Sequence, residues 1–270
     1  MRRLLSKVRA RVFLWFAIFR SFKGLTLKSW VSLFLSPLFH IPYTMFGGLG
    51  NVVTLWGGMY FVRRLGAVVY VRGGTEDIYY LLPGREDDVE RVVFSLLRPG
   101  DVFVDVGANV GYYTLAAAMK GCHVVAVEAV PSTVAVLLAN IRLNNLKDVV
   151  IVPYCAWHED GFVSLQIPLG RYYGIASAFY GGETEVVKIP VKCIRLDKIL
   201  DKYPVIKLVK IDVEGAEYEV LRGLEKVLPR VKFIVLELSR NASAVVSYLR
   251  ERGFKIRKLR FGSYILAYRC

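Results

Sequence analysis

The chain has 270 residues, of which 54% are hydrophobic and 22% charged, and this composition excludes an intrinsically disordered protein. The mean hydropathy of +0.40 is high, but the apolar runs are mostly short and broken by charge, unlike those of a polytopic membrane protein. The net charge of +14 is concentrated at the ends: residues 1–75 hold eleven Lys or Arg and no acid, whereas residues 76–249 hold nineteen basic and twenty-two acidic residues. A basic end of this kind attracts polyanions, either a nucleic acid or an anionic lipid surface.

Residues 1–72 are expected to form an N-terminal extension of the main domain. Residues 2–28 carry eight Lys or Arg among aromatic and aliphatic residues and predict a basic, aromatic-rich helix. Residues 29–62 have no charged side chain, but their prolines and glycines argue against one helix that spans a bilayer. We expect instead an interfacial segment with aromatic anchors, namely Trp30, Phe34, Phe39, Tyr43 and Phe46. The alternative is a packed subdomain that buries these residues against the main domain or a second subunit.

From residue 73 to residue 270 the pattern is that of one α/β domain. A helix with buried valines and leucines ends at Pro99-Gly100, and strands and helices then alternate. We expect strands at 102–105, 122–127, 149–153, 205–211 and 231–238, helices at 112–120, 131–145, 215–228 and 241–252, two strands around a loop within 162–194, and a final hairpin at 254–268. Such alternation predicts a mostly parallel sheet that helices cover on both faces.

The segment DVFVDVGANVGYYTLAAA, residues 101–118, carries the first chemical signal. A strand ends in Asp105, a tight turn follows with Gly107, Asn109 and Gly111, and a helix begins at once. The spacing is D-x-G-x-N-x-G, and an acid before the first glycine suits a ligand with an ammonium group rather than a pyrophosphate. The next strand ends in Glu128, whose carboxylate can accept two hydrogen bonds from a ribose diol. Ribose, ammonium and carboxylate together describe S-adenosylmethionine.

On these residues the chain resembles the FkbM family of class I S-adenosylmethionine-dependent methyltransferases. The resemblance runs from about residue 73 to residue 239 and also rests on AVEAVPSTVAVLLANIRLNN, LVKIDVEGAEYEVLRGLEKVL and VLELS. It implies a Rossmann-like sheet of seven strands with the last strand, 264–268, reversed. It further implies that the turn after Asp105 lines the methionine end of the cofactor, that Glu128 meets the ribose, and that residues 155–160 meet the adenine. We assign eight residues to cofactor binding: Asp105, Gly107, Asn109, Gly111, Tyr113, Glu128, Trp157 and Glu159. Which of Glu159 and Asp160 meets the adenine amine stays open.

Three charged residues are the candidates for catalysis. Lys210 and Asp212 lie at the carboxyl end of the strand VIKLVKI, and Glu237 ends the next strand. Methyl transfer to a hydroxyl needs a group that takes the proton, and by analogy with related folds Asp212 is the first candidate, before Glu237 and His158. The structural alternative is that Lys210 forms an ion pair with a carboxylate and holds the start of the following helix. Asp212, Glu237 and His158 lack a compact metal-ligand spacing, so we predict no bound metal.

The leading hypothesis is therefore an O-methyltransferase that acts on a hydroxyl of a sugar, glycan or lipid-linked intermediate. One alternative is a nucleic-acid methyltransferase, although no N-P-P-Y motif or RNA-binding module is recognisable. Another is a membrane-associated protein that keeps the fold without catalysis. Four cysteines without a C-x-x-C pair indicate a reducing interior, so we expect a cytoplasmic protein that associates peripherally with the inner face of the membrane through residues 1–62. The choice of acceptor is expected to depend on the loop 168–184 and the N-terminal segment.

Overall fold

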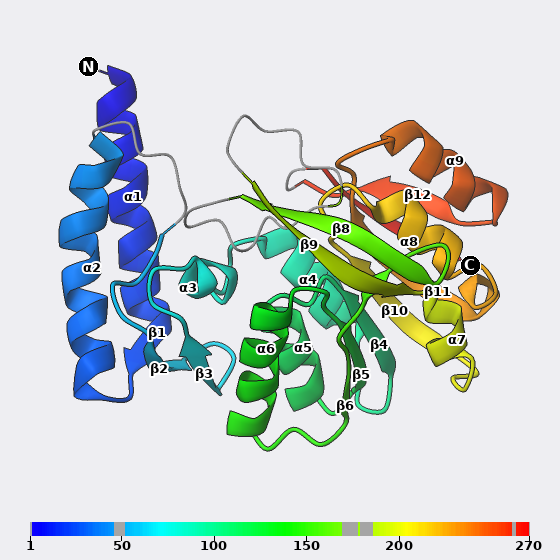
Figure 1. Cartoon of the computed structure of the whole chain (residues 1–270), viewed down its shortest axis with the longest axis horizontal. Coiled ribbons are helices and arrows are strands. Elements are labelled where there is room, and N and C mark those ends of the chain that lie inside the picture. The colour runs from blue at the N-terminus through cyan, green and yellow to red at the C-terminus, as the bar shows by residue number, and fades with distance from the viewer. Residues whose placement is uncertain (1, 46–51, 169–177, 179–185, 261–262, 270) are drawn as a thin grey trace.

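A seven-stranded sheet forms the centre of the molecule (Figure 1). The computed structural model describes residues 2–45, 52–168, 178, 186–260 and 263–269. In spatial order the strands are β12 (Lys255–Lys258), β13 (Tyr264–Tyr268), β11 (Val231–Glu237), β10 (Ile206–Ile211), β4 (Val102–Val106), β5 (His123–Val127) and β6 (Val149–Val152). The strands from β11 to β6 run parallel, and β13 runs antiparallel to β11. The predicted α/β sheet with a reversed last strand is confirmed.

The central strands are apolar on both faces because helices cover both faces. Successive residues of a strand point to opposite sides, so in β10 Leu208 belongs to one hydrophobic cluster and Val209 to the other. The first cluster takes in helices α4 (Asp87–Leu96), α5 (Tyr112–Met119) and α6 (Pro131–Leu143). The second takes in α7 (Leu196–Leu200), α8 (Glu217–Gly223) and α9 (Ala242–Glu251). The sheet is therefore the middle of three layers.

A second, smaller sheet lies beside the carboxyl edge of the first and consists of β7 (Cys155–Ala156), β9 (Val186–Ile194) and β8 (Gly161–Pro168). Strands β8 and β9 pair antiparallel, as expected for 162–194. The loop 168–184, on which we expected the choice of acceptor to depend, lies mostly outside the described residues.

The predicted helix 215–228 is too long. Helix α8 ends at Gly223, and the chain continues through turns into the 3-10 helix η1 (Leu228–Arg230). Beyond Gly223 the backbone makes the tighter three-residue bonds, from Leu224 N to Leu221 O (3.2 Å) and from Val227 N to Leu224 O (2.9 Å). Helical periodicity alone does not distinguish these turns from an α-helix.

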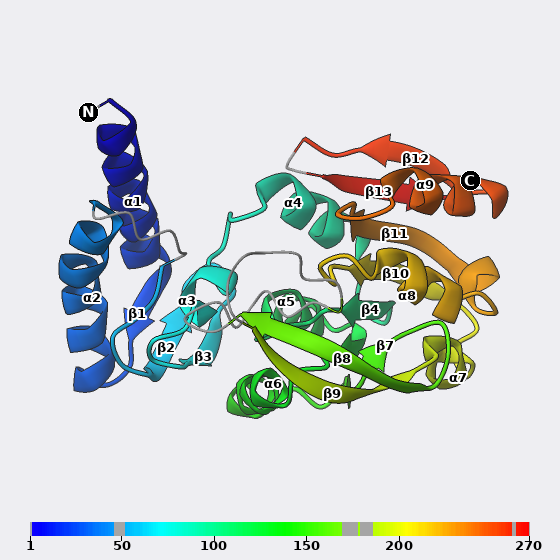
Figure 2. The same ribbon diagram turned by 45° about the horizontal axis from the view of Figure 1, so that its top comes forward.

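The N-terminal segment forms two helices and a three-stranded sheet, at one end of the molecule (Figures 1 and 2). Its elements are α1 (Arg2–Ser21), β1 (Phe22–Gly24), α2 (Leu27–Met45), β2 (Gly58–Val62) and β3 (Ala67–Val71), and the short helix α3 (Asp77–Tyr80) follows them. The helix predicted over 2–28 ends early because β1 pairs antiparallel with β2. Helix α2 continues through Pro37 and Pro42, which we expected to break the backbone ladder. No described helix is long and apolar enough to cross a membrane.

Side chains of α6 attach the N-terminal sheet to the main domain. The free edge of β3 is paired by asparagines: Asn140 Oδ1 accepts from Tyr70 N (2.6 Å), and Asn144 Oδ1 accepts from Val68 N (2.8 Å). Trp15 of α1 belongs to the same hydrophobic cluster as the strands of the main sheet. The N-terminal segment is thus packed on the main domain, and a domain boundary near residue 72 stays a prediction.

Candidate active site

A cavity of about 360 Å³ opens at the carboxyl edge of the main sheet. Its wall is formed by residues that follow the ends of β4, β5, β10 and β11, together with residues of α3, the start of α4 and the small sheet. This edge is where ligands bind in open α/β folds. Of the eleven predicted site residues, all line the cavity except Asp105 and Glu159.

The glycine turn after β4 is held tightly between its neighbouring strands. Gly107 has φ +80°, and a Cβ at this position would lie 1.9 Å from Asp212 O. Gly107 N also donates to Val127 O (3.0 Å), so the turn touches the ends of both β10 and β5. Asn109 has φ +50°, and its Oδ1 accepts from Val110 N (2.8 Å). Only glycine fits at 107, and the turn therefore presents its backbone to the cavity together with Gly111.

Glu128, at the end of β5, is fixed by backbone amides. Its Oε2 accepts from Asn109 N (2.9 Å), and its Oε1 accepts from Val130 N (2.9 Å). Burial raises the pKa of Glu128, although these amide bonds oppose the shift. Close by, Thr133 is 3% exposed, and its hydroxyl has no hydrogen-bond partner among the described residues although it lines the cavity. A buried polar atom without a partner indicates a bound ligand.

Trp157 forms an apolar wall of the cavity with Val130, which precedes α6, and with residues of the small sheet, namely Cys155, Ala156 and Leu165. Its backbone is held by Trp157 N donating to Ile194 O (3.0 Å) and by close packing of α8, where a Cβ on Gly223 would lie 2.1 Å from Trp157 O. The position of Trp157 in this wall therefore depends on contacts with α8 and β9.

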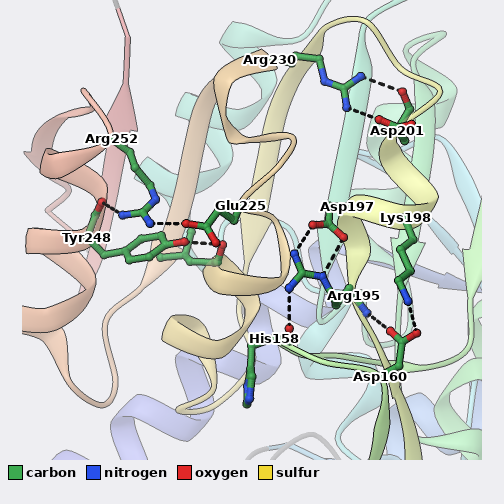
Figure 3. Close-up of polar contacts among 11 residues, drawn as sticks. His158, Asp160, Arg195, Asp197, Lys198, Asp201, Glu225, Arg230, Tyr248 and Arg252 are labelled. Atoms are coloured by element: carbon green, nitrogen blue, oxygen red, sulfur yellow. Dashed lines mark hydrogen bonds and ion pairs between the residues drawn. The ribbon is translucent and has the colours of Figure 1, made fainter.

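The two carboxylates after Trp157 do not reach the cavity. Asp160 is bound instead by Arg195 N (2.9 Å) and by Lys198 Nζ (2.5 Å), as Figure 3 shows. Arg195 also forms an ion pair with Asp197 and donates to His158 O (3.0 Å), which holds the segment in place. The Glu159 side chain is 73% exposed. Neither carboxylate that we expected to meet the adenine amine lines the cavity.

Asp105 does not line the cavity and lies beside Lys210 in the sheet. The two residues are direct neighbours in the register of β4 and β10. Asp105 Oδ2 accepts from the Thr114 hydroxyl (2.7 Å), and Lys210, only 2% exposed, reaches Asp212 Oδ2 (2.9 Å). Burial alone would lower the pKa of Lys210, but Asp212 and Asp105 outweigh burial and raise it. The ion pair expected as the structural alternative is present, and Lys210 also lies 4.8 Å from the centroid of the Tyr113 ring.

Three carboxylates meet where β10 and β11 end. One oxygen each of Asp212, Glu214 and Glu237 lies within 4.8 Å of the others. Burial opposes ionisation of Asp212, but Lys210 outweighs burial and lowers the pKa of Asp212. Burial and the charge of Asp212 raise the pKa of both Glu214 and Glu237 to about 7. The pair Glu214 and Glu237 therefore holds protons near neutral pH, whereas Asp212 stays ionised.

The opposite wall carries aromatic residues that the sequence analysis missed. Tyr79 and Tyr80 of α3 line the cavity, and the Arg85 guanidinium lies 5.5 Å and 5.2 Å from the centroids of their rings. Arg85 also contacts Glu86 Oε1 (2.6 Å), and Glu86 Oε2 accepts from the Tyr113 hydroxyl (2.9 Å). The charged run Arg85–Asp88, directly after Pro83-Gly84, is the one signal in the sequence that marks this wall.

Tyr264 closes the site from β13. Its hydroxyl donates to Asp212 Oδ2 (3.0 Å) and lies 3.3 Å from Glu86 Oε1. His158, the third candidate base, does not line the cavity, and its Nδ1 lies 2.6 Å from Glu219 Oε2 instead. The titratable side chains that meet at this end of the cavity thus include three carboxylates and a tyrosine.

The description of the protein family that matches this chain is "Methyltransferase FkbM domain", and the match covers residues 105–256. The chain belongs to the FkbM methyltransferase family. It is an S-adenosylmethionine-dependent methyltransferase, and the sequence resemblance is confirmed.

Two curated relatives show what this FkbM methyltransferase is similar to. The chain is 29% identical over 196 residues to the 31-O-demethyl-FK506 methyltransferase FkbM of Streptomyces tacrolimicus. That alignment covers 59% of this chain and 75% of the relative. It is 30% identical over 158 residues to the hexuronic acid methyltransferase AglP of Haloferax volcanii, and this alignment covers 57% of the chain and 62% of AglP. Among solved structures, the Thermus thermophilus 16S rRNA N2 G1207 methyltransferase aligns with a TM-score of 0.46 at 15% identity, over 82% of this chain and 52% of that one.

The cavity of this FkbM methyltransferase fits the methyl donor on its own chemistry. The Glu128 carboxylate suits a diol, the unpartnered Thr133 hydroxyl offers a hydrogen bond, and Trp157 lines an apolar slot for a flat ring. The three carboxylates near Lys210 have oxygens at a spacing that a metal ion could use, and Lys210 already supplies a positive charge beside Asp212. The predicted absence of a bound metal stays a prediction.

Proposed function

We propose that this methyltransferase transfers a methyl group to a hydroxyl of a sugar, glycan or lipid-linked intermediate. The observation that carries the proposal is the composition of the part of the cavity wall that α3 and the ends of β10 and β11 contribute. It combines the rings of Tyr79 and Tyr80 with the carboxylates Glu214 and Glu237, and such a set suits a ligand with apolar ring faces and many hydroxyls. The name of one curated relative, a 31-O-demethyl-FK506 methyltransferase, supports transfer to a hydroxyl, and that of the other, a hexuronic acid methyltransferase, supports a sugar acceptor.

The donor half of the cavity would hold S-adenosylmethionine, which supplies an activated methyl group. Glu128 would accept hydrogen bonds from the ribose diol, and the backbone of Gly107 and Asn109 would bind the methionine end. Trp157 would pack on the adenine in place of a pairing carboxylate. Asp105 would act from behind this surface through its charge beside Lys210, whereas Tyr113 lines the cavity and donates to Glu86.

Glu237 is proposed as the group that accepts the proton of the acceptor hydroxyl. The sequence favoured Asp212, but Asp212 already accepts from Lys210 and Tyr264, and these contacts lower its proton affinity. Glu237 has a pKa of about 7, raised by burial and by Asp212, which matches proton transfer near neutral pH. Asp212 and Lys210 would then form a fixed ion pair beside Glu237, and the charge of Asp212 would keep the pKa of Glu237 raised.

A nucleic-acid acceptor is disfavoured by the charges around the cavity. The basic residues that give the chain its net charge lie at its two ends, whereas Asp212, Glu214 and Glu237 line the cavity. A phosphate backbone that approached this wall would meet the negative charge of Asp212, and above about pH 7 also those of Glu214 and Glu237. The same proposal places the enzyme in the cytoplasm, where the buried thiols of Cys122 and Cys155 stay free.

The test is methyl transfer from labelled S-adenosylmethionine to a panel of acceptors. The panel contains a neutral oligosaccharide, an oligosaccharide with uronic acid, a lipid-linked oligosaccharide and structured RNA. The expected result is label on a sugar hydroxyl, located by mass spectrometry and NMR, in at least one carbohydrate acceptor. Label on RNA with none on carbohydrate would contradict the proposal, and so would the absence of S-adenosylmethionine binding by calorimetry.

A further inference from the structure

Helix α2 has its polar face inside and its apolar face outside. The face packed on the protein consists largely of polar residues with at most 5% exposure, namely Ser29, Ser32, Ser36 and His40. The outward face consists of apolar residues, namely Leu27 (81% exposed), Val31 (38%), Phe34 (58%) and Leu38 (66%). These outward residues follow the 27, 31, 34, 38 spacing of a single helical stripe. A helix whose outer face meets water has the reverse arrangement.

The buried serines explain why the helix is fixed in this orientation. Ser32 Oγ donates to Trp56 O (3.0 Å), and Ser36 Oγ accepts from Leu55 N (3.0 Å). The segment that leads into β2 thus obtains hydrogen bonds from α2, and a rotation of the helix that buried the leucines would break these bonds. The outward apolar stripe is therefore a fixed feature of the fold.

Helix α1 presents arginine and phenylalanine on its own exposed stripe, at positions 9, 13, 16 and 20. Phe13 and Phe16 are each 59% exposed. The Arg9 guanidinium lies 5.5 Å from the Phe13 centroid, and that of Arg20 lies 5.8 Å from the Phe16 centroid. Cations flanking aromatic side chains suit the boundary between lipid headgroups and acyl chains.

The two helices form one apolar surface. Phe19 of α1 lies 5.5 Å from Phe34 of α2 between ring centroids, and Trp30 stacks on Phe34 at 5.7 Å. Inside the hairpin, Trp15 Nε1 donates to His40 Nδ1 (3.3 Å). We call the exposed residues of this surface the helical apolar face: Val12, Phe13, Phe16, Leu27, Val31, Phe34, Leu38 and Phe39. Exposed apolar patches of this kind mark interaction sites.

We propose that the helical apolar face docks the protein into the interface of an anionic lipid bilayer, with α1 and α2 lying in the plane of the surface. The docking itself is argued from the helices alone, and only its purpose, which is to bring the cavity to a lipid-linked acceptor, rests on the proposed function. The charges select the partner: the chain has eight Lys or Arg and no acid before residue 63. A second copy of this surface would bring like charges together, whereas anionic headgroups supply the opposite charge.

The position of the helices suits this role. In both views α1 and α2 stand at one end of the molecule, and α3 lies between them and the main sheet (Figures 1 and 2). Tyr79 and Tyr80 of α3 line the cavity. An acceptor whose lipid tail stays in the bilayer would reach the cavity along the side that α3 forms.

Vesicle flotation tests the proposal on the full chain. The vesicles are phosphatidylcholine alone and phosphatidylcholine mixed with phosphatidylglycerol. We expect binding to the anionic vesicles, and a partition coefficient that falls roughly tenfold or more when Phe34→Asp and Leu38→Asp are combined. The matched control is Phe162→Asp, on an exposed phenylalanine (78%) of β8 outside the helical apolar face, and it should bind as the wild type does. Arg9→Glu with Arg20→Glu should reduce binding at low salt more than at high salt.

Three results would overturn the docking. The first is wild-type protein that stays unbound to anionic vesicles at low salt, and the second is Phe34→Asp/Leu38→Asp protein that binds undiminished. The third is a dimer in analytical ultracentrifugation that the same double variant dissociates, because a second copy then covers the face. Calorimetry with S-adenosylmethionine and the melting temperature are measured on every variant. Retained cofactor binding without vesicle binding refutes the docking alone, whereas vesicle binding without cofactor binding refutes the proposed function alone.

Discussion

Replacing Glu237 with glutamine is expected to lower turnover and, above pH 7, to stabilise the folded protein. The pKa of Glu237 is raised from its ordinary value of 4.5 to about 7 by burial and by the charges of Asp212 and Glu214. A carboxyl with a raised pKa binds its proton more tightly in the folded state than in the unfolded state. The stability that this proton contributes at low pH is therefore lost as the pH rises from about 4.5 to about 7.

The pKa difference sets the size of the effect. The step from 4.5 to about 7 corresponds to about 3 kcal/mol as an upper limit, and solvent screening at this partly exposed side chain reduces it to about 1 to 2 kcal/mol. Because glutamine has nearly the same shape and no charge, Glu237→Gln should regain this amount at pH 8 and nothing at pH 5. For a chain of this size the gain corresponds to a melting temperature about 2 to 8 °C higher. Turnover should fall about 10²-fold with cofactor affinity unchanged.

The assay is calorimetric melting at pH 5 and pH 8, combined with a pH profile of kcat/KM. The wild type should gain activity as the pH rises through about 7, since the carboxylate is the active form, and the variant should lose this limb. Glu251→Gln, on a side chain that is 72% exposed, is the control. Wild-type turnover in Glu237→Gln would refute the role of Glu237 as proton acceptor. A lower melting temperature at pH 8 would refute the argument that its neighbours oppose its charge.

Three further variants test other parts of the site. Glu128→Ala should weaken S-adenosylmethionine binding by roughly a hundredfold or more in calorimetry, because two charge-assisted bonds worth roughly 1.5 to 3 kcal/mol each are lost; unchanged affinity would remove Glu128 from the donor half. Lys210→Met should cost about 3 to 5 kcal/mol in denaturant unfolding, because Asp105 and Asp212 lose their counter-charge; a stable variant would show that one of them is protonated. Tyr80→Ala should raise KM for the acceptor and leave cofactor affinity unchanged, and a change in cofactor affinity instead would place Tyr80 on the donor side.

The parts of the site that depend on local sequence could be predicted. The turn from Asp105 to Gly111 has a distinct spacing, and Glu128 follows at the end of the next strand, so register alone brings them together. The reversed strand β13 followed from the family resemblance. Each of these features needs only the parallel sheet to be assembled correctly.

The remaining parts depend on tertiary packing that leaves no periodic signal. Helix α3 has four residues, and its Tyr80 reaches the cavity only because the N-terminal sheet docks on α6. Asp160 is held away from the cavity by Arg195 and Lys198, which lie on another segment of the chain. Glu159 contacts its neighbour His158 instead. The inverted faces of α2 depend on hydrogen bonds to residues 24 and 19 positions further along the chain, which a helical wheel does not show.

The wall formed by Tyr79, Tyr80 and Arg85 lies outside residues 105–256, which the FkbM domain covers. The catalytic half of the cavity and the wall that faces it therefore come from separable stretches of chain. On the proposed function, substitutions in α3 would change which molecules are methylated while β4, β5 and β10 keep the donor chemistry intact. A library restricted to residues 75–86 would then be a compact route to enzymes with new acceptor selectivity.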